Sequence, residues 1–139
     1  MLRYRLIHPE LAAALAGAGH GSTVLLADGN YPLSTATAPS ARRIHLNLRP
    51  GQVPVDDILA TVLDAVPVEA AQVMVPDDGP EPAVFDVFRG ILDDTPLRTL
   101  ERHAFYAAAR GPDLAVAVAS GDQRLFANVL LTIGVVPPA

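Results

Sequence analysis

The apolar residues of the chain recur with two different spacings, one typical of helices and the other of strands. Helical spacing, with apolar positions three or four residues apart, predicts helices over residues 9–17 (to 19 at most), 55–66, 84–92 and 103–110. The first is expected to start at Pro9, since proline suits the first helical turn, and to stop at the glycines that follow. The segment from residue 55 is the clearest amphipathic helix.

Apolar runs and alternating apolar positions predict strands between these helices. Residues 23–27 form a continuous apolar run that ends at Asp28, as in a strand covered on both faces. Ile44, Leu46 and Leu48 alternate with polar neighbours, which predicts a half-buried strand. Further strands are expected over residues 70–75, 97–102, 114–119 and 129–133. Alternating strands and helices indicate an α/β fold with a mostly parallel sheet, and no linker divides residues 1–139 into separate domains.

The high hydropathy of the chain predicts self-association. Half of the residues are hydrophobic and the mean hydropathy is +0.30, which is high for a small domain. The longest wholly apolar run is only about six residues, so neither a membrane helix nor a secretory signal is expected. We therefore expect a soluble, cytoplasmic protein that buries its surplus apolar surface in an interface between copies of the chain.

The charged and reactive residues exclude several classes of function. A formal charge of −5 argues against a nucleic-acid partner, because phosphates require a dense positive field. The chain has no cysteine and no lysine, which excludes thiolate nucleophiles, disulfides and Schiff-base chemistry. Its four histidines form no HxH or HxxxH pair, and the adjacent aspartates are interpreted as helix caps and turns. No metal site is expected.

Two polar residues have settings that suit chemistry. His20 lies between two glycines, which let a ligand approach closely, and imidazole groups exchange protons near neutral pH. Asp28 follows a buried strand, and ligands of α/β sheets gather at the carboxyl ends of strands. From local pattern alone, His20 is equally a helix-end residue and Asp28 equally a turn former.

A third candidate segment lies at residues 101–106, where polar and aromatic groups are dense. On a helix, His103 and Tyr106 share a face, although a surface patch of ion pairs is the alternative interpretation. Asn128 precedes the last strand, and a simple turn residue is the alternative interpretation there.

The ordered set of these segments resembles the ribose pyranase / fucose mutarotase family. The matching pieces are HPEL at 8–11, GHG at 19–21, ADGNYP at 27–32, VM at 73–74, RHAFY at 102–106, FANVLL at 126–131 and GV at 134–135. The resemblance covers nearly the whole chain and is closer overall to the fucose mutarotase branch. It implies a three-layer α/β/α sandwich and a cytoplasmic isomerase that interconverts anomers of a free monosaccharide by general acid–base ring opening, without cofactor or metal. It also implies a ring-like homo-oligomer with active sites at subunit interfaces.

The resemblance assigns roles to individual residues. His20 matches the proton-transferring histidine, and Asp28 matches a sugar-binding aspartate. The remaining substrate-binding candidates are Met74, Arg102, His103, Tyr106, Phe126 and Asn128.

The sequence departs from the family pattern at particular positions, and these leave the substrate open. Phe126 replaces the family's tyrosine, and Ser22 replaces the aspartate of the fucose-type GHGD motif. RIHL at 43–46 looks more like the ribose-type branch. A ribose-type pyranase, which exchanges pyranose and furanose forms, and a non-catalytic sugar-binding relative are the alternatives.

The spacing of His20 and Asp28 has a geometric consequence. A strand between them advances about 3.3 Å per residue, which places its two ends roughly 20 Å apart. The two side chains can share a pocket only if the glycine-rich loop folds back, or if a second subunit completes the site.

Overall fold

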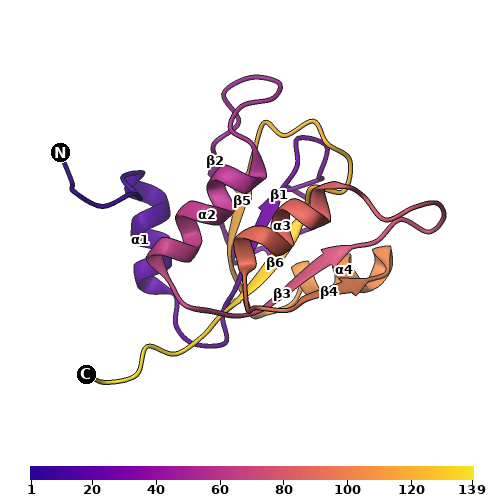
Figure 1. Ribbon diagram of the computed structural model, residues 1–139. Coiled ribbons are helices and arrows are strands. Elements are labelled where there is room, and N and C mark those ends of the chain that lie inside the picture. Colours follow the sequence, from indigo (N-terminus) through magenta and orange to yellow (C-terminus); the bar gives the residue numbers. More distant parts are fainter.

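The computed structural model describes residues 1–139 and consists of four helices and six strands (Figure 1). The helices are α1 (Pro9–Gly17), α2 (Val55–Ala65), α3 (Val84–Leu92) and α4 (Arg102–Ala109). The strands are β1 (Thr23–Ala27), β2 (Arg42–His45), β3 (Val68–Met74), β4 (Leu97–Leu100), β5 (Leu114–Ala119) and β6 (Val129–Ile133). They form one sheet in the order β2-β5-β1-β6-β3-β4.

The sheet consists of two parallel units joined by a single antiparallel strand. On one side β5 pairs in parallel with β1 and with β2, and on the other β3 pairs in parallel with β4. β6 lies between the two units and runs antiparallel to both β1 and β3. The mixed, mostly parallel sheet of a single-domain α/β protein is therefore confirmed.

Helices and loops cover the sheet on both faces. One core lies under α1, α2 and α3, and includes Val24 and Leu26 of β1. The other lies under α4 and the segment 31–41, and includes Leu25 and Ala27 of the same strand. Alternate residues of β1 thus enter opposite cores, and all four are fully buried, which explains the continuous apolar run. The three-layer prediction is confirmed.

The predicted starts of α1, α2 and α3 are confirmed, whereas α4 begins one residue earlier than predicted; side chains cap the starts of α1 and α4. The His8 side chain accepts a hydrogen bond from the Leu11 amide (3.2 Å), and Pro9 occupies the first turn of α1. The Glu101 carboxylate accepts from the amides of His103 (3.0 Å) and Ala104 (2.7 Å), so α4 begins at Arg102. The strand predicted over residues 97–102 was therefore too long, because Glu101 ends β4 at Leu100.

A second strand prediction was wrong at its carboxyl end. β2 ends at His45, and Leu48, expected on a half-buried strand, is 77% exposed. Residues 46–53 instead leave the sheet as a loop, in which the Leu48 amide donates to the Gln52 carbonyl (3.0 Å). The alternation of Ile44, Leu46 and Leu48 therefore does not continue as a buried strand face beyond His45.

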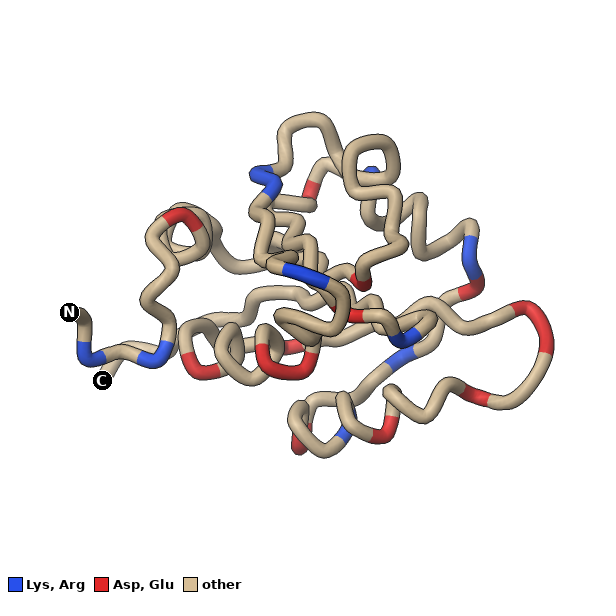
Figure 2. Tube along the Cα trace, turned by 90° about the horizontal axis from the view of Figure 1, so that it is seen from above, with Lys and Arg blue, Asp and Glu red and all other residues tan.

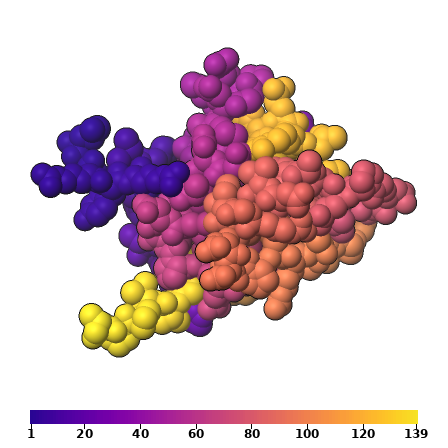
Figure 3. All heavy atoms as spheres, viewed as in Figure 1, coloured from indigo at the N-terminus to yellow at the C-terminus, as the bar shows by residue number.

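The chain ends lie on the outside of the fold, and Asp28 and Asp122 are the only charged residues that are buried. The two terminal segments project from the same side of the body (Figure 3), where Leu2, Tyr4, Ile7, Val135 and Val136 are exposed. Basic and acidic residues are interspersed along the trace (Figure 2). None of the helices combines the length and the apolar character that crossing a membrane requires.

Candidate active site

Asp28 and Asn128 form the centre of a polar site at the carboxyl end of β1, in the middle of the sheet. Asp28 follows β1 and Asn128 precedes β6, and because these strands are antiparallel neighbours the two residues meet. The Asp28 amide donates to Asn128 Oδ1 (2.8 Å), and Asn128 Nδ2 donates to Asp28 Oδ2 (2.9 Å). Both residues are buried, so each fixes the other in an orientation set by two hydrogen bonds.

Burial changes the acidity of the Asp28 carboxyl group. Removal from water raises its pKa, while hydrogen bonds from the Asn30 amide and from Asn128 oppose the shift without cancelling it. The second carboxylate oxygen, Oδ1, accepts from the Asn30 amide at 2.9 Å. In its ionised form Asp28 is an acceptor poised to bind hydroxyl groups.

Six of the eight site residues predicted from the sequence line one small pocket here. They are Asp28, Met74, Arg102, Tyr106, Phe126 and Asn128. The pocket has a volume of about 140 Å³, whereas ligand pockets usually enclose about 300–1,000 Å³. The pocket of one chain is therefore smaller than a usual ligand pocket.

Aromatic residues form one wall of this pocket. The rings of Tyr31 and Tyr106 lie 5.6 Å apart between centroids, and the Arg110 guanidinium lies 5.5 Å from the centre of the Tyr106 ring. The Tyr31 hydroxyl donates to the Ala36 carbonyl (2.9 Å), and this hydrogen bond holds the segment 31–36 in place. Phe126 has a left-handed backbone with φ of 64°, which is rare for an aromatic residue.

Sequence reasoning missed three residues that also line the pocket. They are Asn30, Tyr31 and Leu125. Asn30 and Tyr31 lie two and three residues after Asp28, so the rule that ligands gather where strands end could have found them. Leu125 carries no such signal, because its place depends on how the loop before β6 folds.

His20 lies away from this pocket, at the opposite end of β1. It sits on a tight turn in which the Ser22 amide donates to the Gly19 carbonyl (3.1 Å) and Gly21 has a φ of 81°. The Gly21 amide donates to the Ile133 carbonyl (2.9 Å), which holds the turn against the far end of β6. The glycine-rich loop therefore does not fold back toward Asp28.

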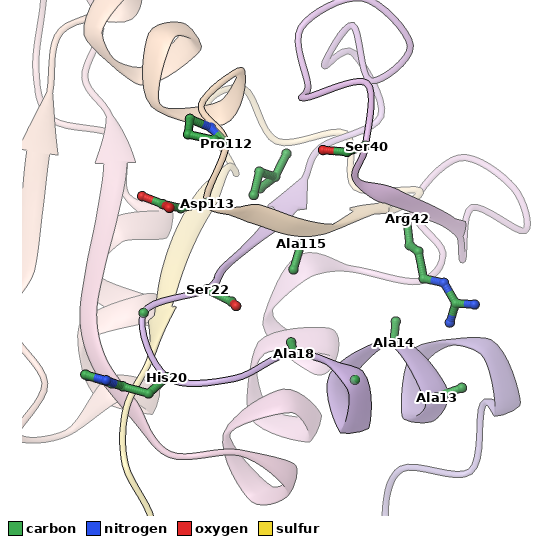
Figure 4. A pocket seen from close by; sticks show the side chains of 13 residues that line it. Ala13, Ala14, Ala18, His20, Ser22, Ser40, Arg42, Pro112, Asp113 and Ala115 are labelled. Atoms are coloured by element: carbon green, nitrogen blue, oxygen red, sulfur yellow. The ribbon is translucent and has the colours of Figure 1, made fainter.

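The surroundings of His20 form a second, larger depression, with a volume of about 670 Å³. Its lining comes from α1, the His20 turn and the start of β5, with Arg42 at the opposite end from His20 (Figure 4). His20 Nε2 lies 3.2 Å from Glu69 Oε2 of β3, and both side chains are about half exposed. No sequence pattern singles out Glu69, whose carboxylate lies within hydrogen-bond distance of the imidazole.

His103 is the eighth predicted residue, and it lies outside both depressions. It is exposed in the first turn of α4, whereas Arg102 and Tyr106 of the same helix line the Asp28 pocket. Its role in sugar binding stays a prediction. Among residues 1–139 no group of three or more potential metal-ligating side chains is present.

Comparison with known proteins decides which family the chain represents. Residues 1–136 match the model of the RbsD / FucU transport protein family. The chain belongs to this family. It is 31% identical to a fucose mutarotase from Danio rerio, over 96% of this chain and 92% of that protein. It is 33% identical to a D-ribose pyranase from Paracidovorax citrulli, over 97% of this chain and 98% of that protein.

Solved structures of the RbsD/FucU family share the fold. A fucose mutarotase from Streptococcus pneumoniae, crystallised in complex with L-fucose, superimposes with a TM-score of 0.85 at 26% identity, covering 99% of this chain and 100% of that one. RbsD from Bacillus subtilis, complexed with D-ribose, has a TM-score of 0.86 at 20% identity over 99% and 100% of the two chains. The family resemblance inferred from the sequence segments is confirmed, and its named members include isomerases of both kinds.

Proposed function

We propose that the protein is a cofactor-independent monosaccharide mutarotase that interconverts the anomers of a free, fucose-like sugar. The observation that carries the proposal is the buried Asp28–Asn128 pair, which faces the same small pocket as Arg102 and Tyr106. Carboxylate, amide and guanidinium groups are the partners that sugar hydroxyls require, and Tyr106 adds an aromatic face for the ring. Membership of a family with named fucose mutarotases and ribose pyranases supports the same reaction class.

The reaction needs only proton transfer, which suits the residues at hand. Opening a cyclic hemiacetal removes the proton of the anomeric hydroxyl group and protonates the ring oxygen. Closure on the other face of the carbonyl group reverses both transfers and gives the other anomer. General acid–base catalysis by an imidazole contributes typically about 10²–10⁴ in rate, adequate for a reaction that already proceeds in water. His20 is the proposed proton carrier, and Asp28 and Asn128 hold the sugar hydroxyls.

A ribose-type pyranase is the second candidate, and one observation favours it. The identity to the D-ribose pyranase from Paracidovorax citrulli, 33%, is as high as that to the fucose mutarotase from Danio rerio, 31%. The two reactions share the ring-opening step and differ in which hydroxyl group closes the ring. A sugar-binding relative without catalysis is the remaining alternative.

The test of the proposed function is magnetisation transfer by NMR. The anomeric protons of L-fucose, D-galactose and D-ribose are saturated one at a time, with and without the protein, and transfer to the other ring forms is followed. Protein-dependent transfer between fucose anomers supports the mutarotase, and transfer between ribose pyranose and furanose forms supports the pyranase. Saturation transfer from protein to sugar without exchange would indicate a binding protein only.

We further propose that the active site is shared between copies of the chain in a homo-oligomer. His20 and Asp28 lie at opposite ends of β1, whose five residues span about 16 Å. The 140 Å³ pocket is also too small to enclose a ligand by itself. Exposed apolar residues on both terminal segments offer surface for association. A stable 14.6 kDa monomer in light scattering at micromolar concentration would contradict this proposal.

Mixing two inactive variants tests the shared site directly. In a ring where each site takes His20 from one copy and Asp28 from its neighbour, random mixing of His20→Ala and Asp28→Asn chains should restore about one quarter of the sites. The measurement is the exchange rate after unfolding and refolding the two variants together, compared with each variant refolded alone. No recovery would contradict a site shared between copies.

The raised pKa of Asp28 predicts how sugar affinity depends on pH. The ionised carboxylate accepts hydroxyl hydrogen bonds, and protonation removes this capacity. Affinity should therefore be constant in the neutral range and fall as pH drops through the folded-state pKa of Asp28, at a midpoint above 3.8. Titration of sugar binding by NMR from pH 7 down to about pH 3 measures the midpoint. A midpoint at or below 3.8 would contradict the burial of this carboxyl group.

The cytoplasmic location expected from the sequence stays part of the proposal. Free monosaccharides released or imported into that compartment are the substrates that such an enzyme would equilibrate.

A further inference from the structure

The loop between β5 and β6 holds two of the proposed sugar-binding residues, and a polar cluster fixes it from outside the pocket. Phe126 and Asn128 lie near its end, directly before β6. Asp122 and Arg124 lie nearer its start, and neither lines the Asp28 pocket. Their contacts reach α2 and the turn after β1, and nothing in the proposed chemistry uses them.

Asp122 is buried and uses both carboxylate oxygens within the chain. Oδ1 accepts from the backbone amide and from Nε of Arg124, each at 3.0 Å. Oδ2 accepts from the amide of Val55 (2.9 Å), the first residue of α2, and from the Arg124 guanidinium. Burial opposes the ionised form, but these hydrogen bonds outweigh it and hold the pKa of Asp122 below its usual value.

The cluster also reaches the turn that holds Asp28. The Asp122 carbonyl accepts a hydrogen bond from the Gly29 amide (2.8 Å), the residue directly after Asp28. Arg124 makes a further ion pair with Asp56 in the first turn of α2. Asp122 and Arg124 therefore connect the sugar-binding loop, the Asp28 turn and the start of α2.

The backbone between Arg124 and Asn128 needs such support. Phe126 has the left-handed φ of 64°, a conformation that a bulky side chain adopts only when its surroundings impose it. The Ala127 amide donates to the Arg124 carbonyl (3.3 Å), which closes the turn around Phe126. On the other side, Asn128 is fixed by Asp28. The turn is thus held at both ends.

We propose that Asp122 and Arg124 are positioning residues, whose ion pair holds the 124–128 turn so that Phe126 and Asn128 line the sugar pocket beside Asp28. This inference rests on the proposed function of that pocket. The Asp122–Arg124 pair should therefore affect substrate binding, because Phe126 and Asn128 are proposed to contact the sugar. It should not affect proton transfer, because the proposed proton carrier His20 lies at the other end of β1.

The decisive variant is Arg124→Gln, which removes the guanidinium and leaves the backbone contacts of Asp122 in place. For the sugar that the parent protein exchanges, KM should rise about tenfold while kcat changes by less than about twofold, because binding is weakened and proton transfer is not. Arg124→Lys keeps the charge and should restore KM to within about threefold of the parent value. A loss in kcat with KM unchanged would overturn the assignment.

Arg89→Gln is the matched control. Arg89 also pairs with two carboxylates, Glu81 and Asp86, and its side chain is 41% exposed, as is that of Arg124. It lies on α3, away from both depressions. The control should keep the parent KM. An equal rise of KM in both variants would mean that loss of any such ion pair suffices, and would overturn the proposal.

A measurement without sugar separates this inference from the proposed function. The side-chain amide signals of Asn128 should shift, and their hydrogen exchange should accelerate, in Arg124→Gln but not in Arg89→Gln, because the hydrogen bond to Asp28 Oδ2 is loosened. If the parent protein exchanges no sugar, the proposed function fails, but the Asn128 signals still test whether Arg124 positions the 124–128 turn. Unchanged Asn128 signals in a folded Arg124→Gln protein would overturn it. Should Arg124→Gln not fold, Asp56→Asn removes the second carboxylate partner and should move the same signals in the same direction.

Discussion

Replacement of His20 by alanine should slow sugar exchange by about 10² or more while sugar affinity changes little. The reason is that His20 is proposed to move protons, whereas the Asp28–Asn128 pair binds the sugar and lies at the other end of β1. A group that acts on the transition state affects rate more than affinity. Exchange NMR gives the rate, and calorimetry with the same sugar gives the affinity.

His45→Ala is the matched control for this experiment. His45 is exposed at the end of β2 and lines neither depression, so its removal should leave exchange at the parent rate. If His20→Ala exchanges sugar as fast as the parent, His20 only pairs with Glu69 at the surface. Proton transfer would then be assigned to His103 or Tyr106.

The substitution expected to destabilise the fold most is Gly121→Ala. A Cβ atom at position 121 would meet the Gln52 carbonyl oxygen at 1.8 Å and the Arg49 carbonyl oxygen at 2.5 Å. Both are backbone atoms, so the clash can be relieved only by separating the loop 49–53 from the loop that follows β5. Gly121 also donates to the Val53 carbonyl (3.0 Å) and accepts from the Gly51 amide (2.7 Å). The free energy of unfolding should fall by about 3 kcal/mol or more.

Chemical denaturation with urea measures this loss, and Gly90→Ala supplies the contrast. A Cβ at position 90, within α3, meets no atom within 4 Å, so alanine there should raise the free energy of unfolding by about 0.5–1 kcal/mol. The same chemical change thus has opposite signs at the two positions. A Gly121→Ala protein as stable as its parent would show that the two loops separate readily.

Most of the fold was predictable because its elements carry strong local signals. The two-sided burial of β1 appears as an uninterrupted apolar run, and α2 as apolar positions on one face. The errors fell where a side chain or a loop overrides that pattern. Glu101 ends β4 by capping α4, and the loop 46–53 exposes Leu48 although its spacing matches a strand.

The candidate site was predictable only in part, because its residues come from distant segments. Asp28 and Asn128 are 100 residues apart in the sequence, and only the antiparallel pairing of β1 with β6 brings them together. The strand-end rule singled out Asp28 but left it equally a turn former, and the resemblance to a family assigned sugar binding to both residues. Asp122 was missed, although it lies where β5, a parallel neighbour of β1, ends. The rule that selected Asp28 applies to it as well.

The central place of β6 determines when the sheet can be completed during translation. Within the sheet, the β2-β5-β1 unit and the β3-β4 unit are joined by this strand alone, and it is the last of the six to be translated. Until it emerges, the nascent chain carries two unpaired apolar strand edges, which are the surfaces most prone to aggregation. Asn128 directly precedes β6, so its bond to Asp28 can form only when the two halves close. The Asp28–Asn128 pair of the proposed sugar site therefore forms in the same event that covers the two strand edges.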